Sequence, residues 1–373
     1  MWVMIASAGV VLGVVVSLRT SIQAPVATPV THATPLITPQ NRRSQPHSPT
    51  LPRPWPRWRF GLRDELPLTL PSREILSALC MCVGGCWQCG EMTAVGAEGG
   101  DARVGVSVGA VLADAAAPSE IYEDIPAAAR YAESVGLDSL WAGDHLTMGP
   151  VPLLDCTLVL AAAAAATDRV LLGTAVFVPS LRPLAWAAKQ VATLSVLSGE
   201  RRLQLGVAAG AGLEDDHRAA GFARADRARR TDVFPLALPY LPAGRTTDLP
   251  GPDGPVAAQL APAVRPPVIW VGGASVKAMR RAVRFGDGWL ASLLTADEFA
   301  AAVQKLNELA DRAGRPRLEL GVVTHAAIDN VRNSVVRTTA ASVLQSAYGL
   351  TQERADQLAI AGSPENVADQ LHA

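Results

Sequence analysis

Three apolar segments decide the fold of this chain: LDSLWAGDH (137–145), VLLGTAVFV (170–178) and RRLQLGVAAG (201–210). Each is a nearly continuous apolar run, which is typical of a parallel strand buried on both faces. Alanine-rich stretches of helical length, 155–168 and 183–199, separate the three segments. Strands that alternate with helices in this way predict βα units joined by right-handed crossovers.

The same alternation continues on both sides of these segments. Further strand-like runs are RVGVSVGA (103–110), PPVIWVGG (266–273), GDGWLAS (286–292) and LELGVVTHAAI (318–328). About seven strands in roughly 270 residues approach the size of an eight-stranded barrel. The sequence therefore predicts an α/β fold, a (β/α)8 TIM-type barrel.

The end of the predicted barrel departs from the eight-strand pattern. Ser363 and Pro364 make a good helix start, a cap followed by a first-turn proline, but no strand-like run follows before Ala373. We therefore expect a barrel that lacks its last strand, with two open sheet edges unless another segment fills the gap. Earlier in the chain, we expect a helix over 232–241 and a loop rich in Gly and Pro over 242–255.

The first hundred residues have a different composition. Residues 1–18 are an apolar run at the lower edge of the roughly 17–25 residues that a membrane helix needs. Residues 21–71 hold 11 of the 28 prolines, a linker composition. We predict a disordered N-terminal extension over 1–100 and a barrel domain over 103–373; the alternative for 1–18 is a membrane anchor.

Cysteines and charges narrow the class of protein. Four of the five cysteines, Cys80, Cys82, Cys86 and Cys89, have a spacing that is not that of a paired zinc motif, so we predict no metal site. Without a disulfide framework in the barrel, a cytoplasmic location is expected. Lys and Arg number 33 and Asp and Glu number 34, a balance that argues against nucleic-acid binding.

Reactive groups in a βα barrel lie at the carboxyl ends of the strands. His145, beside Asp144, is the one clear proton-transfer group at the ends of the predicted strands. Gly272 and Gly273 end another strand directly before a helix, where backbone amides can face an anion, although an ordinary turn needs the same glycines. The sequence shows no dinucleotide fingerprint and no catalytic serine triad.

These segments, taken in order, resemble the bacterial luciferase-like monooxygenase family, and most closely its branch of oxidoreductases that depend on the deazaflavin coenzyme F420. The resemblance covers about residues 103–373 and rests on LDSLWAGDH, ATDRVLLGTAVFV, KQVATLSVLSGERRLQLGVAAG, PPVIWVGGAS and FGDGWLAS. It implies a (β/α)8 barrel that holds a flavin or deazaflavin at its C-terminal mouth.

The resemblance also implies roles for individual residues. His145 matches a catalytic histidine and Asp144 an acid that contacts the cofactor. The bond between Ala175 and Val176 matches a position where this family often has a non-proline cis peptide behind the cofactor ring. The remaining implied cofactor contacts are Val178, Ala209 and Gly210 at the ring, and Gly272, Gly273, Ser275 and Val276 at the phosphate.

The implied activity is hydride transfer between F420 and a small organic substrate. One alternative is a flavin mononucleotide (FMN) monooxygenase; another is an inactive protein, because the barrel is expected to lack a strand. Ala211 stands where the sugar-phosphate dehydrogenases of the family have a glutamate base, so that substrate is not implied. Homodimers are common in the family, and a flavin or F420 reductase is a further implied partner.

Overall fold

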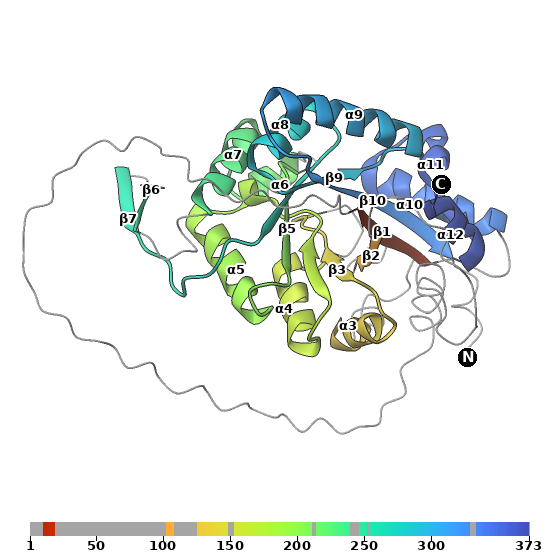
Figure 1. Ribbon diagram of the computed structural model, residues 1–373, viewed down its shortest axis with the longest axis horizontal. Coiled ribbons are helices and arrows are strands. Elements are labelled where there is room, and N and C mark those ends of the chain that lie inside the picture. Colours follow the sequence, from red (N-terminus) through yellow and green to blue (C-terminus); the bar gives the residue numbers. More distant parts are fainter. Residues whose placement is uncertain are drawn as a thin grey trace, which may run out of the picture. The chain divides into compact units, whose positions relative to one another are not determined.

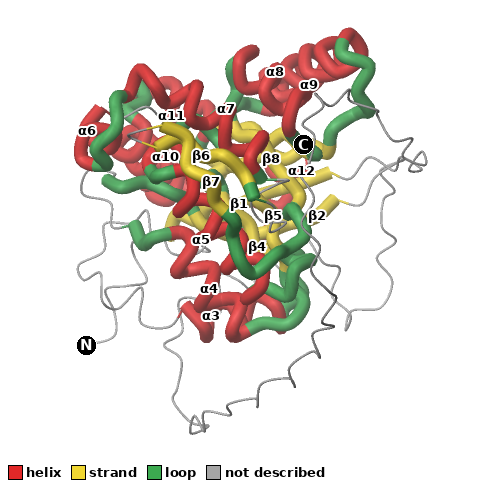
Figure 2. Tube along the Cα trace, turned by 90° about the vertical axis from the view of Figure 1, so that its left-hand side faces the viewer, coloured by secondary structure: helices red, strands yellow, loops and turns green. Residues whose placement is uncertain are grey.

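A computed structural model describes residues 10–18, 102–107, 125–147, 153–210, 214–238, 246–251, 254–328 and 333–372. Eight strands form a closed ring in the order β1, β2, β3, β4, β5, β8, β9, β10, because β1 also pairs with β10. The ring strands are β1 (Val10–Leu18), β2 (Ala102–Ser107), β3 (Ser139–Ala142), β4 (Leu171–Thr174), β5 (Leu203–Val207), β8 (Val268–Gly272), β9 (Gly288–Ser292) and β10 (Glu319–Ile328). Neighbours from β2 to β10 are parallel. The predicted barrel is confirmed, with helices around the strands (Figures 1 and 2).

Strand β1 closes the barrel from an unexpected part of the chain. It lies antiparallel between β10, with Val15 opposite Val323, and β2, with Val15 opposite Gly105. The prediction that residues 1–100 have no fold is therefore wrong for Val10–Leu18. This apolar run, rich in valine, supplies backbone hydrogen bonds to both edges that a seven-stranded barrel leaves open.

The position of β1 changes two other expectations. The alternative expectation for the apolar run 1–18 is a membrane anchor. The structure instead places Val10–Leu18 of this run in the barrel sheet. Among the described residues, the structure has no helix with the length and apolar character needed to cross a membrane. The proline-rich segment 21–71 and the cysteine cluster between Cys80 and Cys89 lie outside the described residues.

Proline at Val15 tests the closing role of β1. Because Val15 lies opposite residues of both neighbouring strands, Val15→Pro is expected to lower the free energy of unfolding by about 2 kcal/mol or more. Val10→Pro is the control, since Val10 is the first residue of the strand and pairs with Ile328 alone. Urea unfolding followed by circular dichroism measures both variants; equal stabilities would contradict the closing role.

The helices follow the predicted alternation. They are α3 (Ile125–Ser134), α4 (Cys156–Ala166), α5 (Leu184–Leu197), α6 (Glu214–Ala219), α7 (Arg227–Ala237), α8 (Val276–Phe285), α9 (Ala296–Arg312), α10 (Asn333–Tyr348), α11 (Gln352–Leu358) and α12 (Pro364–His372). Short 3-10 turns are η1 (Pro179–Leu181) and η2 (Arg224–Asp226). Asp155 caps α4 by accepting hydrogen bonds from the backbone of Thr157 and Leu158, and Thr295 with Glu298 forms a capping box at α9.

Two stretches differ from the sequence predictions. The expected helix over 232–241 is α7, which begins earlier at Arg227 and ends at Ala237 with Pro235 inside it. Part of the expected loop over 242–255 forms a hairpin of β6 (Thr247–Gly251) and β7 (Gly254–Ala258). A short strand β11 (Ile360–Gly362) pairs in parallel with the last three residues of β10. The strands β6, β7 and β11 form by pairing with a partner strand, and composition alone does not reveal such pairing.

Two tryptophans fill the barrel interior. Trp141 and Trp270 meet edge to face, with ring centroids 6.3 Å apart. Each ring lies over a glycine of a neighbouring strand, Gly173 under Trp141 and Gly288 under Trp270, where a Cβ would overlap the ring. Trp270 donates to Gln204 Oε1 at 2.9 Å, so its buried indole N–H is satisfied. The interior is therefore a packed core, and chemistry is confined to its rim.

Candidate functional site

The predicted ring-binding residues meet at the carboxyl ends of β4, β5 and β8. A Cβ on Gly272 would lie 2.7 Å from Val176 Cγ1, and one on Gly210 would lie 3.0 Å from Val178 Cγ1. Val178 therefore faces a glycine that follows the neighbouring strand β5, and Val176 faces a glycine of β8, which is one strand further round the ring. The bond between Ala175 and Val176 is cis, as the resemblance implies.

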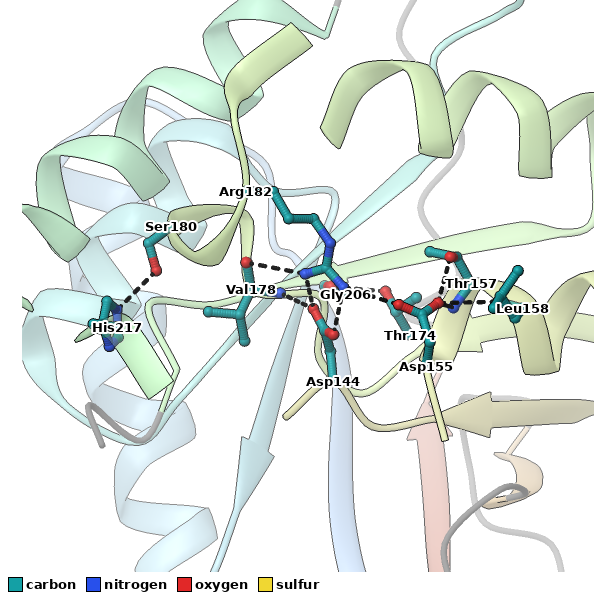
Figure 3. Close-up of polar contacts among 10 residues, drawn as sticks. All are labelled: Asp144, Asp155, Thr157, Leu158, Thr174, Val178, Ser180, Arg182, Gly206 and His217. Atoms are coloured by element: carbon teal, nitrogen blue, oxygen red, sulfur yellow. Dashed lines mark hydrogen bonds and ion pairs between the residues drawn. The ribbon is translucent and has the colours of Figure 1, made fainter. Parts of the chain in front are cut away.

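Asp144 is the centre of a buried polar cluster next to these residues (Figure 3). Its side chain is 5% exposed and accepts hydrogen bonds from both terminal nitrogens of Arg182, at 2.6 and 2.7 Å. The backbone N–H of Val178 also donates to Asp144 Oδ2, at 2.8 Å. Asp144 therefore fixes the chain that follows β4, and its predicted contact with a cofactor stays a prediction.

The neighbours of Asp144 reinforce this cluster. Burial opposes the charge on Arg182, but the hydrogen bonds and charge of Asp144 outweigh it and raise the pKa of the guanidinium. Arg182 also lies over the Phe177 ring, 4.6 Å from its centroid. Burial and the Asp144 carboxylate raise the pKa of the Cys156 thiol well above its ordinary value, so this cysteine stays a neutral thiol.

His145 follows Asp144 directly and is half-buried at the rim. The loop after it is anchored at Thr147, whose backbone N–H and hydroxyl both donate to Asp216 Oδ1 of α6, at 3.0 and 2.5 Å. Asp216 is itself buried. The carboxylates of Asp144 and Asp216 thus form hydrogen bonds on either side of His145 in the chain, just after the carboxyl end of β3.

The turn from β8 to α8 has the geometry expected of an anion site. Gly273 has a φ of +116°, a left-handed conformation that favours glycine. Ser275 caps α8 by accepting a hydrogen bond from the backbone of Ala278, and both Ser275 and Val276 are exposed. The first backbone amides of α8 are therefore available to a negatively charged group.

These features fit a cofactor with a flat ring and a phosphate. Val176, which is half-buried, and Val178, which is 3% exposed, pack beside the glycines at the mouth, and the start of α8 offers amides to a phosphate. FMN and F420 share both groups, so this geometry does not separate them. Ala209, like Gly210, follows β5 at the mouth and is half-buried. No group of three or more His, Cys, Asp or Glu with metal-binding geometry occurs in the described part of the chain.

The sequence predictions omitted Arg182 and Asp216. Arg182 has a signal in the sequence, because it is a single charge within the apolar stretch FVPSLRPLAW (177–186), and a buried charge needs a partner. Asp216 has no such signal, because it lies among the charged residues EDDHR (214–218) and only α6 packing against the β3 loop distinguishes it.

A second histidine lies at the rim, on β10. His325 is 5% exposed, and its Nε2 lies 3.0 Å from the hydroxyl of Tyr348, the last residue of α10. The two rings meet edge to face with centroids 5.3 Å apart. Burial lowers the pKa of His325 to about 4 and raises the pKa of Tyr348 to about 12, so both side chains are neutral near pH 7.

The lowered pKa of His325 predicts that the folded protein loses stability in acid. Between pH 6.5 and pH 4 the unfolded chain protonates His325 and the folded protein does not, so stability falls as the pH is lowered through this window. The expected loss at pH 4.5 is about 2–3 kcal/mol relative to pH 7. His325→Gln should abolish this part of the loss, measured by urea unfolding at both pH values; an unchanged pH profile would show that His325 is protonated in the folded state.

Comparisons with known proteins agree with this architecture. A family model described as luciferase-like monooxygenase matches residues 102–348. The uncharacterized protein Rv0940c of Mycobacterium tuberculosis (strain ATCC 25618 / H37Rv) is 30% identical over 175 residues, which cover 46% of this chain and 60% of that protein. The chain thus spans less than two thirds of the length of the curated relatives it matches.

Solved structures share the fold. The monooxygenase RslO1 from Streptomyces bottropensis has a TM-score of 0.56 and 22% identity, over 69% of this chain and 83% of that one. An F420-dependent secondary alcohol dehydrogenase in complex with an F420-acetone adduct has a TM-score of 0.54 and 18% identity, over 67% and 84%. Because the family model matches well over half of its residues, the chain belongs to the luciferase-like monooxygenase family.

Proposed function

We propose that the chain is an oxidoreductase that binds F420 at the C-terminal mouth of its barrel and acts on a small organic substrate. One observation carries this proposal: the apolar side chains of Val176 and Val178 and the exposed start of α8 after Gly273 lie at the same mouth of the barrel. The valine side chains would support a ring, and the backbone amides at the start of α8 would bind a phosphate. When bound, F420 supplies hydride transfer.

The residues of the chain position the reactants and move the proton. Val176 and Val178 would support the ring from one face, which leaves its other face for the substrate. Asp144 holds Val178 in place through its backbone N–H. His145, half-buried between the anchored residues Asp144 and Thr147, would give or take the proton that accompanies the hydride.

FMN is the alternative cofactor, since the family model is that of a monooxygenase and FMN has the same two groups. With FMN the proposed activity is oxygenation with reduced flavin supplied by a partner. The other alternative, an inactive protein, rests on an open barrel, and the closure of the ring by β1 favours the proposed activity over it. Fluorescence titration of the purified protein with F420 and with FMN tests the proposal: preference for F420 supports it, preference for FMN favours the monooxygenase, and binding of neither overturns both.

Replacing His145 tests its part in the reaction. His145→Ala is expected to lower turnover about 10²–10⁴-fold and to change the dissociation constant of the cofactor less than about threefold, because an acid or base acts mainly on the rate. Leu146→Ala is the matched control, since Leu146 is the next residue and is 53% exposed. Steady-state kinetics and titration measure both variants; unchanged turnover in His145→Ala would remove His145 from the mechanism.

A further inference from the structure

The register of β10 directs His325 toward the barrel interior. A Cβ on Gly321 would lie 2.9 Å from Leu290 inside the barrel, and Val323 packs against the same interior cluster, which Val176 also contacts. Alternate residues of a strand share a face, so His325 faces the interior as well, one step nearer the C-terminal mouth.

Like the residues of the candidate site, His325 lies near the carboxyl end of its strand. Val323 lies opposite Ser292, the last residue of β9, so His325 lies beyond the end of that strand. Tyr348 covers it, with a hydrogen bond to Nε2 at 3.0 Å. The other ring nitrogen, Nδ1, has no hydrogen-bond partner among the residues that the structure describes. This buried imidazole lies at the mouth of the barrel, with one ring nitrogen hydrogen-bonded to the protein and the other without a partner in the described part of the chain. The second nitrogen can therefore form a hydrogen bond with a bound ligand.

We propose that His325, held by Tyr348, is a substrate-binding residue whose Nδ1 forms a hydrogen bond with an uncharged hydroxyl or carbonyl group of the substrate. This inference rests on the proposed function, because it places the substrate between the ring face at Val176 and His325. His145 and His325 would then approach the substrate from different strands, β3 and β10, with β2 and β1 between them in the ring.

The chemistry of the pair selects the class of substrate. His325 and Tyr348 are both neutral near pH 7 because of burial, so the pair offers a hydrogen bond and no charge. A carboxylate or phosphate placed there would lose its hydration without a compensating cation. An alcohol or a ketone loses less hydration free energy on entering the site, and it gains a hydrogen bond with the imidazole of His325 there. The pair therefore favours uncharged substrates that carry one oxygen near the reacting carbon.

Nuclear magnetic resonance of the imidazole nitrogens tests this inference. The chain has six histidines, and His325→Gln assigns the signals of His325 in protein labelled with ¹⁵N-histidine and loaded with the cofactor that binds. The probes are cyclohexanol and cyclohexanecarboxylate, which share a ring and differ in charge. We expect cyclohexanol to shift the Nδ1 signal of His325 and cyclohexanecarboxylate to leave it unchanged.

Two variants separate binding from folding. Tyr348→Phe keeps the ring but loses the hydroxyl that orients His325, and should weaken cyclohexanol binding about five- to tenfold. Ser346→Ala removes an exposed hydroxyl of the same helix, which bonds only the backbone of Ser342, and should have no effect. An unmoved His325 signal, an equal shift with both probes, or equal affinity in Tyr348→Phe would overturn the inference.

Cofactor fluorescence on the same samples separates the two proposals. If neither F420 nor FMN binds, the proposed function fails, and the present inference fails with it. If a cofactor binds and the His325 signal does not respond to cyclohexanol, the inference alone fails and the proposed function stands.

Discussion

Replacing Arg182 with methionine is expected to lower the free energy of unfolding by about 3–5 kcal/mol, because it leaves the carboxylate of Asp144 buried without its cation. Methionine keeps an apolar stem of similar length but removes the guanidinium, so the loss reports the charge, its hydrogen bonds and its contact with the Phe177 ring together. Chemical denaturation at pH 7 measures the effect.

Two further variants make this prediction specific. Arg182→Met/Asp144→Asn removes the buried carboxylate as well as its cation, and Asp155, the other carboxylate near Arg182, is 35% exposed, so part of the lost stability should return. Arg218→Met is the control, because the pair of Arg218 with Asp215 has a similar distance of 2.7 Å but both side chains are 77% exposed. Its expected effect is within about 0.5 kcal/mol. A loss below about 1 kcal/mol in Arg182→Met would show that Asp144 is solvated or protonated.

The Asp144 cluster also links stability to the site. Asp144 accepts from the backbone of Val178, whose side chain forms part of the proposed ring face. Arg182→Met should therefore weaken cofactor binding as well as folding. Unchanged binding in the remaining folded protein would show that Val178 is positioned without the cluster.

Gly206→Ala is expected to destabilise the barrel by about 3 kcal/mol or more. Gly206 lies within β5, and a Cβ there would overlap the backbone carbonyl oxygen of Thr174 in β4. Backbone in the centre of a sheet cannot move aside as a flexible side chain can, so strands β4 and β5 would have to separate. The Thr174 hydroxyl donates to the Gly206 carbonyl at 2.8 Å, and this bond would be lost with the separation.

Gly143→Ala is the matched control for Gly206→Ala. Gly143 also lies at the C-terminal mouth, but its Cβ would have ordinary contacts, 3.6 Å to the Ala175 carbonyl oxygen and 3.8 Å to Leu153. Its expected effect is within about 1 kcal/mol and of either sign. Thermal unfolding of both variants provides the comparison. Similar melting temperatures would show that β4 and β5 adapt more easily than close backbone packing allows.

Local sequence was sufficient for most of the barrel. Strands buried on both faces need unbroken apolar runs, so β3, β4, β5, β8 and β9 are visible in composition alone. The start of α12 was equally visible, since Ser363 accepts a hydrogen bond from the backbone of Asn366 as a cap does. The hairpin of β6 and β7 was not, because Gly and Pro in both strands predict a loop.

Some residues of the candidate site could also be predicted from the sequence, and others could not. Residues at strand ends, such as Val176, Val178 and Gly272, meet at one mouth because parallel strands end at the same edge of a sheet. Tyr348 and Asp216 contribute through helices that return over the rim, and no spacing in the sequence connects them with His325 or Thr147. Such contacts depend on the packing of whole elements.

The sequence by itself determined the parallel strands, the helices between them and the positions of His145 and the glycine turn, because each follows from local apolar patterning or backbone conformation. Only the tertiary structure decided that Val10–Leu18 closes the ring, that Arg182 neutralises Asp144 and that Tyr348 covers His325. The physical reason is that an apolar run, a cation or a histidine acquires its role from a partner distant in sequence. Folding brings such partners together, and their energies depend on how far that packing excludes water.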